Sequence, residues 1–401
     1  MRAVVGFGDR GHAGFRAMRW LMWRAWSCWL AAVLAWPLAQ AQAQALRPQM
    51  ITAGLDHPWA LAFMPDGRML VTERPGRLRV VDADGRLRPP VSGLPEIVAQ
   101  GQGGLLDLIV DSDFASNRTI YFCFAQAAES GNGNSTALAR ARLSTGLDRL
   151  EDVRVIFSQK PKFASGAHFG CRIVESRQDG KADGHLFLTL GDRFSRMADA
   201  QTLDNHHGKV VRIDKQGGVP KDNPFAGAGR GLPEIWSYGH RNLQGAALGP
   251  DGRLWVHEHG PQGGDEINIP LRGRNYGWPI ITYGVNYGGG QIGAGLSRKD
   301  GLEQPVHYWV PSIAPSGMAF LSSDRYGPAW QGNLFIGALA GRHLVRIEWQ
   351  ADGDGARIVR ESRLLAELGE RIRDVRQGPD GLLYVLTDSS NGRLIRLLPP
   401  A

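Results

Sequence analysis

Residues 237–278 of this 401-residue chain concentrate side chains capable of chemistry around one short apolar run. Arg241 and Asn242 come before the run 253–256, whose composition predicts a strand. The sequence His-Glu-His at 257–259 follows directly from the end of that strand. Polar groups at both ends of a short strand predict that this segment forms one rim of a sheet assembly.

The His-Glu-His sequence raises the question of a transition-metal site, because imidazole and carboxylate are common ligands of such metals. Successive residues of a strand point to opposite faces, so His257 and His259 share a face and Glu258 does not. The spacing therefore argues against a transition metal held by these three side chains.

A turn followed by a short apolar run recurs along the chain. The turns contain Asp-Gly or Gly-Asn, and the runs after them predict strands at 69–72, 186–190, 254–257, 334–337 and 382–387, with a less regular copy at 111–124. Spacings of roughly fifty to eighty residues, without long helical periodicity, are typical of sheets repeated around an axis. We therefore predict an all-β fold, a six-bladed β-propeller of four-stranded antiparallel blades.

The two ends of the chain are expected to meet. A propeller closes its ring so that no long sheet edge stays open, and the predicted strands 50–52 and 394–397 would then share a blade. The Gly-rich segments 130–136, 225–231 and 285–296 are interpreted as loops between strands. Residues 46–401 are accordingly expected to form a single domain.

The first 45 residues have the pattern of a secretory signal peptide. A basic segment at 19–24 precedes an apolar stretch at 26–36, and alternating Ala and Gln follow at 39–45. The apolar stretch is short for a membrane span, although a retained anchor is the alternative. We expect cleavage near Ala43 or Ala45 and a periplasmic or secreted protein without a stable membrane span.

Most of the excess positive charge belongs to that leader. The whole chain has a net charge of +7, and residues 1–45 carry five Arg against one Asp, so the remainder has a net charge of +3. No block of Lys and Arg remains after the leader. A nucleic-acid partner is therefore not indicated.

Two cysteines, Cys123 and Cys171, remain after the leader, without the spacing of a metal site. Export permits a disulfide between them. Because Cys123 lies in an apolar run, we favour a buried thiol over a bridge. A Cys-His nucleophile pair between Cys171 and His168 is a further alternative, which we disfavour.

Nine motifs extend over nearly the whole chain after the leader. They are HPWALAFMPDGRMLVTERPGRL (57–78), GQGGLLDL (101–108), AHFGCRIV (167–174), TLGDR (189–193), YGHRNLQG (238–245), HGPQGGDEIN (259–268), NYGWP (275–279), WVPSIAPSGMAF (309–320) and RIRDVRQGPDGLLYVLTD (371–388). In this order they resemble the soluble quinoprotein glucose and aldose sugar dehydrogenases, which use pyrroloquinoline quinone (PQQ). The fold of that family is a six-bladed propeller with the quinone over its central channel, which agrees with the fold predicted from the repeats.

The resemblance implies three catalytic residues. His168 would be the general base for the sugar C1 hydroxyl, a role that suits an imidazole because it titrates near neutral pH. Asp192 would hydrogen-bond and orient that base. Arg241 would stabilise negative charge on a quinone oxygen.

The same resemblance implies a set of residues that bind the cofactor. Gln102 and Asn242 would hydrogen-bond the quinone beside His168 and Arg241. Arg371 and Arg373, two residues apart and so on one face of a strand, would pair with its carboxylates. The resemblance also implies a weaker contact between Ser312 and the cofactor.

Two Ca²⁺ ions are also implied by the resemblance. The carbonyls of Gly260 and Pro261 would hold one ion that also binds the quinone, in keeping with the preference of Ca²⁺ for oxygen ligands. Glu266 and the carbonyl of Tyr276 would hold a second, structural ion.

The sequence departs from the family pattern in two places. Where the family often has a lysine that contacts the quinone, this chain has Ala340, and Arg342 is the nearby residue able to supply the charge. The segment 176–181 resembles an insertion between His168 and Asp192, which we expect to lie close enough to alter access to the site.

We therefore expect a PQQ-dependent aldose sugar dehydrogenase, which oxidises the C1 hydroxyl to a lactone. Electrons would pass to a quinone, a cytochrome or a dye rather than to a nicotinamide, and the protein would be a monomer or homodimer. The alternatives are a non-enzymatic propeller that binds a glycan or protein partner and a Ca²⁺-dependent hydrolase such as a lactonase. A non-enzymatic propeller would tolerate the loss of His168, Asp192 or Arg241, and all three are present. A hydrolase of this kind would need a central metal walled by carboxylates, whereas this chain offers backbone carbonyls and anion-binding arginines.

Overall fold

The computed structural model describes residues 46–227 and 229–400. The predicted signal peptide at 1–45, with cleavage near Ala43 or Ala45, lies outside the described residues. Within them, no helix has the length and apolar character that crossing a bilayer requires.

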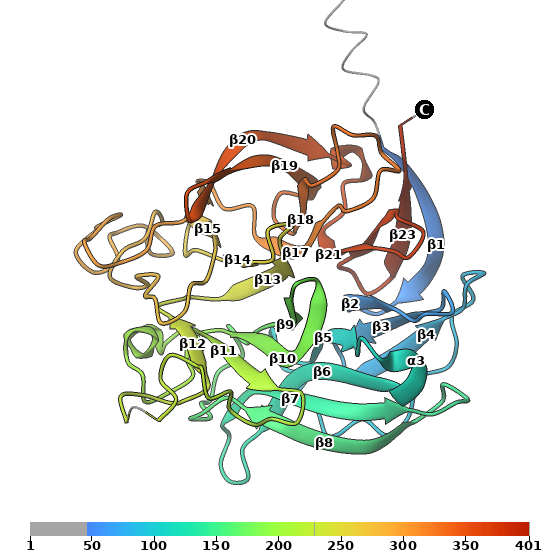
Figure 1. Ribbon diagram of the computed structural model, residues 1–401, viewed down its shortest axis with the longest axis horizontal. Helices are drawn as coiled ribbons and strands as arrows, with labels where there is room; N and C mark the ends of the chain where they lie inside the picture. Colours follow the sequence, from blue (N-terminus) through green and yellow to red (C-terminus); the bar gives the residue numbers. More distant parts are fainter. Residues whose placement is uncertain (1–45, 228, 401) are drawn as a thin grey trace, which may run out of the picture. The chain divides into compact units, whose positions relative to one another are not determined.

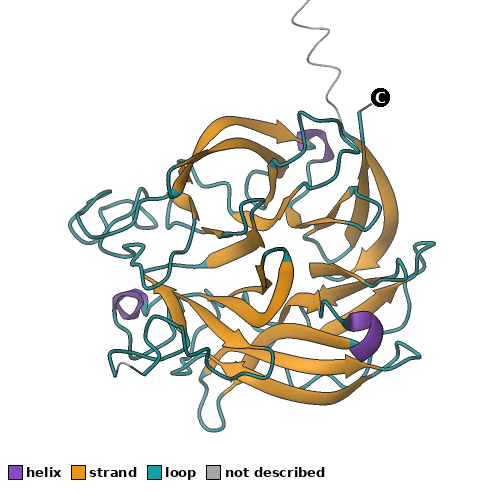
Figure 2. Ribbon diagram, viewed as in Figure 1, coloured by secondary structure: helices purple, strands orange, loops and turns teal. Residues whose placement is uncertain are grey.

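Short antiparallel strands joined by turns make up six separate sheets (Figures 1 and 2). The first three comprise β2 (Pro58–Phe63), β3 (Met69–Glu73) and β4 (Arg77–Val81); β5 (Leu105–Val110), β6 (Thr119–Ala127), β7 (Asn134–Leu143) and β8 (Leu150–Ser158); and β9 (Gly170–Gln178), β10 (Lys181–Leu190), β11 (Lys209–Asp214) and β12 (Ile235–Tyr238).

The other three sheets comprise β13 (Leu243–Leu248), β14 (Leu254–Glu258), β15 (Asp265–Asn268) and β16 (His307–Trp309); β17 (Pro315–Phe320), β18 (Leu334–Ala338), β19 (His343–Asp352) and β20 (Gly355–Leu364); and β21 (Ile372–Gln377), β22 (Leu383–Thr387), β23 (Gly392–Leu398) and β1 (Arg47–Leu55). Short helical turns are formed by α3 (Phe114–Asn117), η1 (Met197–Gln201) and η2 (Ala366–Leu368).

The predicted six-bladed propeller is confirmed. Each predicted strand that follows a turn is the second strand of one sheet: β3, β6, β10, β14, β18 and β22. Five of these middle strands are buried along almost their whole length because neighbouring blades cover both of their faces. The sixth, β10, is buried from Leu186 to Leu190 and is more exposed towards its hairpin tip. Five sheets have four strands, and the β2–β4 sheet has three, extended by isolated bridges from Leu78 to Val91 and from Val81 to Leu87.

Ring closure occurs as predicted. The first strand, β1, pairs with the last, β23, so that Met50 lies opposite Ile395 and Thr52 lies opposite Leu394. Figure 1 shows these two strands, blue and red, side by side. One blade therefore contains both ends of the described chain, which leaves no open gap between the first and last sheets.

A buried charge network ties the innermost strands together. Arg172 of β9 contacts Asp107 of β5 and Asp374 of β21, each at 3.0 Å. Arg376 contacts the same two carboxylates at 2.7 and 2.9 Å. Because these residues come from three blades, the network fixes the centre of the ring. The guanidinium of Arg172 also lies 4.2 Å from the ring centroid of Trp59.

One face of the ring collects the polar motifs. Each inner strand runs antiparallel to the second strand of its blade, so residues before the inner strand and after the second strand lie at the same end. Leu243 of β13 pairs with Glu258 of β14, which brings Arg241 and Asn242 beside His259. The rim predicted for the 237–278 segment is therefore present.

The expectation for the segment 176–181 was wrong. It forms the tip of the β9–β10 hairpin, where Gln178 pairs with Lys181, whereas Gly170 pairs with Leu190 at the end near His168 and Asp192. Eight residues of strand separate the two ends, about 25 Å of extended chain. This hairpin tip therefore lies away from the site.

The prediction of a buried thiol at Cys123 was also wrong. Cys123 of β6 and Cys171 of β9 form a disulfide between two neighbouring blades. Cys171 is consequently not a free thiol that could act as a nucleophile with His168.

Candidate active site

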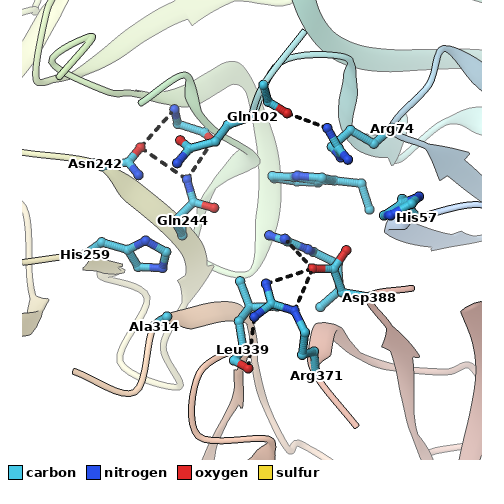
Figure 3. A pocket seen from close by; sticks show the side chains of 14 residues that line it. His57, Arg74, Gln102, Asn242, Gln244, His259, Ala314, Leu339, Arg371 and Asp388 are labelled. Carbon is cyan, nitrogen blue, oxygen red and sulfur yellow. Dashed lines mark hydrogen bonds and ion pairs between the residues drawn. The ribbon is translucent and has the colours of Figure 1, made fainter. Parts of the chain in front are cut away.

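A cavity of about 430 Å³ opens at the end of the ring where the inner strands begin (Figure 3). Its walls come from all six blades and are mostly polar. The lining residues are His57, Trp59, Arg74, Gly101, Gln102, Gly170, Asn242, Gln244, His259, Ala314, Leu339, Arg371, Arg373 and Asp388.

His168 lies two residues before β9, which begins at the lining residue Gly170, and pairs with Asp192 just after β10. His168 Nδ1 is 2.6 Å from Asp192 Oδ1, and both side chains are buried. Burial lowers the pKa of His168 below its ordinary value, and the hydrogen bond and charge of Asp192 oppose that shift. The imidazole is therefore neutral at neutral pH.

The Asp192 carboxylate also fixes which nitrogen of His168 can accept a proton. An ionised carboxylate only accepts hydrogen bonds, so the short contact makes Nδ1 the protonated nitrogen. The other nitrogen, Nε2, has no hydrogen-bond partner among the described residues and is not fully buried. It is consequently the atom of His168 able to take a proton.

Close backbone approaches hold the pair in place. Gly191 precedes Asp192, and a side chain there would collide with the carbonyl oxygen of His168. His168 itself adopts a left-handed backbone conformation, with φ of 52°. Such a conformation costs on the order of 1 kcal/mol for a residue other than glycine, so the surrounding contacts must enforce it.

Two amide side chains present donors to the cavity. The Gln102 side-chain oxygen accepts a hydrogen bond from the backbone N–H of His168 at 2.8 Å. The Asn242 side-chain oxygen accepts from Gly170 N at 3.3 Å and from Gln244 Nε2 at 3.2 Å. With both oxygens occupied, the amide nitrogens of Gln102 and Asn242 are available to acceptors in the cavity.

Cationic side chains also line the cavity: Figure 3 shows Arg74 and Arg371, and Arg373 belongs to the same lining. Arg371 and Arg373 share one carboxylate, Asp388, at 3.0 and 3.1 Å. Arg373 Nε is buried and has no partner in the described part of the chain. Arg371 and Arg373 together have only one carboxylate to balance their two positive charges, and Arg74 adds a third positive charge to the cavity wall. This excess positive charge and the unsatisfied donor fit an anionic ligand such as a tricarboxylate quinone.

Arg241 is buried beside this cavity. Its Nη1 donates to the carbonyls of His259 at 3.0 Å and Gly260 at 2.6 Å, and its guanidinium lies 5.2 Å from the Trp278 ring centroid. The backbone N–H of Arg241 donates to Glu258. These contacts hold the cation rigidly.

The carbonyls predicted to hold the first Ca²⁺ adjoin the same region. Gly260 and Pro261 line a second cavity of about 540 Å³ that shares His259 and Ala314 with the first. The Gly260 carbonyl already accepts a hydrogen bond from Arg241, while no hydrogen bond from the described residues, 46–227 and 229–400, occupies the Pro261 carbonyl. These carbonyl oxygens suit a hard cation, although Arg241 shares one of them.

Glu266 and Tyr276 lie together in a small third cavity with Gly260. Burial raises the pKa of Glu266 to about 8, and the neighbouring carboxylate of Glu258 adds to the rise. The oxygen of Asn268, whose amide nitrogen bridges the two carboxylates, is buried without a partner. This concentration of oxygen atoms and uncompensated negative charge fits a bound cation.

No group of three or more His, Cys, Asp or Glu side chains forms a metal site within residues 46–227 and 229–400. His259 Nε2 contacts the Pro315 carbonyl at 2.7 Å, and Glu258 contacts His240 at 2.9 Å. A cation at this rim would therefore depend on backbone carbonyls as well as on Glu266.

The predicted residues do not all share one cavity. Gln102, Asn242, Arg371 and Arg373 line the first, whereas Ser312 lines the second and donates its hydroxyl to Asp265 at 2.7 Å. The suggestion that Arg342 replaces the family lysine was wrong, because its side chain contacts the Gly369 carbonyl at 3.4 Å and Leu339 occupies the cavity wall.

Sequence reasoning missed several lining residues, notably His57, Trp59, Arg74 and Asp388. All four belong to quoted motifs, at 57–78 and 371–388, so a signal was present. The motifs did not reveal which of their side chains face the cavity.

Comparison with known proteins gives consistent results. The model of the glucose/sorbosone dehydrogenase family matches residues 55–396. Over 348 residues the chain is 48% identical to the aldose sugar dehydrogenase YliI of Escherichia coli (strain K12), an alignment that covers 86% of this chain and 91% of that protein.

Solved structures are similar as well. The apo form of the soluble aldose sugar dehydrogenase from Escherichia coli is 46% identical with a TM-score of 0.82, covering 88% of this chain and 100% of that one. The PQQ-bound aldose sugar dehydrogenase from Streptomyces coelicolor is 26% identical with a TM-score of 0.70, covering 89% and 99%.

Proposed function

The chain belongs to the glucose/sorbosone dehydrogenase family, and on this premise we propose that it oxidises aldose sugars at the C1 hydroxyl to the lactone with PQQ as cofactor. The observation that carries the proposal is the buried His168–Asp192 pair beside a cavity lined by amide donors and arginines. A related aldose sugar dehydrogenase with bound PQQ supports the choice of cofactor.

His168 acts as the general base. Its Nδ1 is committed to Asp192, so Nε2 receives the proton of the C1 hydroxyl. Asp192 holds the ring in this tautomer and stabilises the imidazolium that forms. When bound, PQQ supplies the two-electron acceptor for the hydride that leaves C1.

The remaining polar residues bind and orient. Arg371 and Arg373, with Arg74, pair with the carboxylates of the quinone, and the amide nitrogens of Gln102 and Asn242 donate to its oxygens. Arg241, held by the carbonyls of His259 and Gly260, provides fixed positive charge where negative charge develops. Ser312 is a weaker contact from the adjoining cavity.

Two Ca²⁺ ions complete the proposed site. The carbonyls of Gly260 and Pro261 would hold one ion, which would supply Lewis-acid polarisation when bound. Glu266 and the carbonyl of Tyr276 hold the structural ion. An external quinone, cytochrome or dye accepts the electrons, and the protein acts in the periplasm or outside the cell as a monomer or homodimer.

The proposal is tested by reconstitution. The mature protein, freed of cofactor, is titrated with PQQ in the presence of Ca²⁺, and dye reduction is followed with a panel of aldoses. We expect saturable PQQ binding, sugar-dependent dye reduction and a lactone product. Absence of retained quinone absorbance together with inactivity towards every sugar would refute the proposed function.

A further inference from the structure

Trp278 connects the two halves of the candidate site. Its indole Nε1–H donates to Asp192 Oδ2 at 2.8 Å, and its ring lies 5.2 Å from the guanidinium carbon of Arg241. One side chain therefore touches both the partner of the base and the fixed cation. This residue belongs to the NYGWP motif at 275–279, whose other implied contribution is the carbonyl of Tyr276.

The carboxylate of Asp192 depends on protein donors for its hydrogen bonds. The carboxylate is fully buried, and its Oδ1 already accepts from His168 Nδ1 at 2.6 Å and from Phe194 N at 2.8 Å. The Trp278 N–H is the donor that the described residues provide to Oδ2. A buried carboxylate oxygen without a donor carries an uncompensated desolvation cost, so this contact decides how the carboxylate is oriented.

Trp278 is itself held firmly. Its backbone N–H donates to the Gly239 carbonyl at 2.9 Å, and its carbonyl accepts from Gln201 Nε2 at 2.7 Å. The side chain is buried, and it packs with Ala200 and Ile292. The indole donor thus has a fixed position relative to Asp192.

We propose that Trp278 is a positioning residue for the oxidation, which orients Asp192 and thereby keeps His168 in the tautomer whose Nε2 accepts the proton. The inference rests on the proposed function for its effect on turnover. The chain of hydrogen bonds from Trp278 through Asp192 to His168 can be measured without cofactor or sugar.

The direction of the effect on pH dependence follows from the charges around His168. Asp192 faces the imidazole with negative charge, while Arg193, Arg241 and His259 are the other charged or titratable groups near it. By donating a hydrogen bond to Asp192, the indole N–H offsets part of the negative charge on that carboxylate. Its removal strengthens the attraction between Asp192 and a protonated His168, so the base becomes harder to deprotonate.

The variant Trp278→Phe removes the donor and keeps an aromatic ring. For the reconstituted enzyme we expect kcat to fall by about 10- to 100-fold, the usual cost of losing a partner that orients a catalytic group. KM for the sugar should change little, and the acid limb of the pH profile should move to higher pH. The matched control is Trp255→Phe, because Trp255 is buried but its N–H has no partner in the described structure.

A measurement on the unmodified chain covers the case in which Trp278→Phe does not fold. In ¹⁵N-labelled protein without cofactor, one indole N–H signal should shift as His168 titrates, and this shift should disappear in His168→Ala. Trp278→Phe, where folded, should also alter the ¹⁵N signals that report the His168 tautomer. The inference is overturned if no indole signal follows the titration, or if Trp278→Phe and Trp255→Phe share one acid limb. Inactivity of the loaded wild-type protein, with the indole titration present, would instead count against the proposed function alone.

Discussion

At the scale of single residues, the account depends on His168 as a base with one free nitrogen. The Asp192 contact occupies Nδ1, and the Gln102 side chain fixes the backbone N–H of the same residue. Neither contact consumes Nε2. His168 can therefore change its protonation state without disturbing the hydrogen bonds that position it.

The variant His168→Ala should separate binding from turnover. We expect PQQ binding to persist, because Arg371, Arg373 and the amide donors remain, while kcat falls by about 10²- to 10⁴-fold with loss of the base. The matched control is His185→Ala. His185 also pairs with an aspartate, Asp183 at 3.2 Å, but it lies in β10 towards the hairpin tip and away from Asp192. Stopped-flow dye reduction measures the difference, and unchanged turnover in His168→Ala would show that another group is the base.

The pH profile provides a second prediction at this scale. Burial holds the pKa of His168 below its ordinary 6.5, so the neutral, active form persists to lower pH and the acid limb of kcat/KM should lie below pH 6.5. Asp192→Asn removes the charge that opposes this shift, so its acid limb should move to still lower pH as the plateau falls. Initial rates measured from pH 4 to 8 test this prediction. An acid limb at higher pH in Asp192→Asn than in the wild type would contradict the assignment of His168 as the base.

At the scale of elements, the positions of the site residues follow from strand direction. Inner strands and their neighbours run antiparallel, so loops before β5, β9, β13 and β21 meet loops after β10 and β14. The pair Arg371 and Arg373 enters β21 beside Asp388, which follows β22. The proposed cofactor site is consequently formed by strand ends from different blades.

Arg371→Ala and Arg373→Ala should each weaken PQQ binding. A charge-assisted hydrogen bond contributes about 1.5–3 kcal/mol, which corresponds to a Kd about 10- to 100-fold higher. At saturating PQQ, kcat should change far less than Kd, because neither residue touches the base. Arg342→Ala is the control and should leave Kd unchanged. Equal Kd values for all three variants, measured by absorbance titration, would remove the arginine pair from the cofactor site.

Local sequence predicted much of this arrangement. Asp-Gly or Gly-Asn turns followed by apolar runs located the second strand of five blades, and a less regular copy at 111–124 located that of the sixth, because turn chemistry and strand composition are both local. The pairing of β1 with β23 followed from the need to close the ring. The error at 176–181 arose because the preceding strand, β9, was not recognised, so the direction of the hairpin was unknown.

Contacts between blades were not accessible in the same way. The apolar surroundings of Cys123 are the same whether its sulfur is free or bridged, and only the packing of β6 against β9 brings Cys171 to it. Likewise, the motif containing His57, Trp59 and Arg74 was noticed, but which side chains enter the cavity depends on the position of the next blade.

At the scale of the whole molecule, closure of the ring makes the site possible. The cavity has walls from all six blades, and the network of Arg172, Asp107 and Asp374 holds the inner strands beneath it. Trp59 lies between this network and the cavity, stacked on Arg172. The candidate site therefore depends on closure of the ring.

The disulfide between β6 and β9 is expected to stabilise this assembly. The bridge joins residues with a sequence separation of 48. Removing a disulfide of this kind lowers the free energy of unfolding by about 2–4 kcal/mol. The double variant Cys123→Ser/Cys171→Ser should unfold at lower temperature than the oxidised wild type, while its rate at 25 °C stays similar. Wild-type protein treated with reductant is the matched comparison. Identical unfolding midpoints for the oxidised wild type and the double variant would show that the bridge adds no stability.

The central claim, that the loaded site oxidises a sugar, is tested most directly by a single turnover without an electron acceptor. Protein carrying one equivalent of PQQ and Ca²⁺ is mixed anaerobically with excess aldose, and lactone is quantified together with the quinone absorbance. The account predicts one equivalent of lactone per loaded chain, loss of the oxidised quinone spectrum and no further product until a dye is added. Absence of lactone, or product that accumulates without any acceptor, would contradict it.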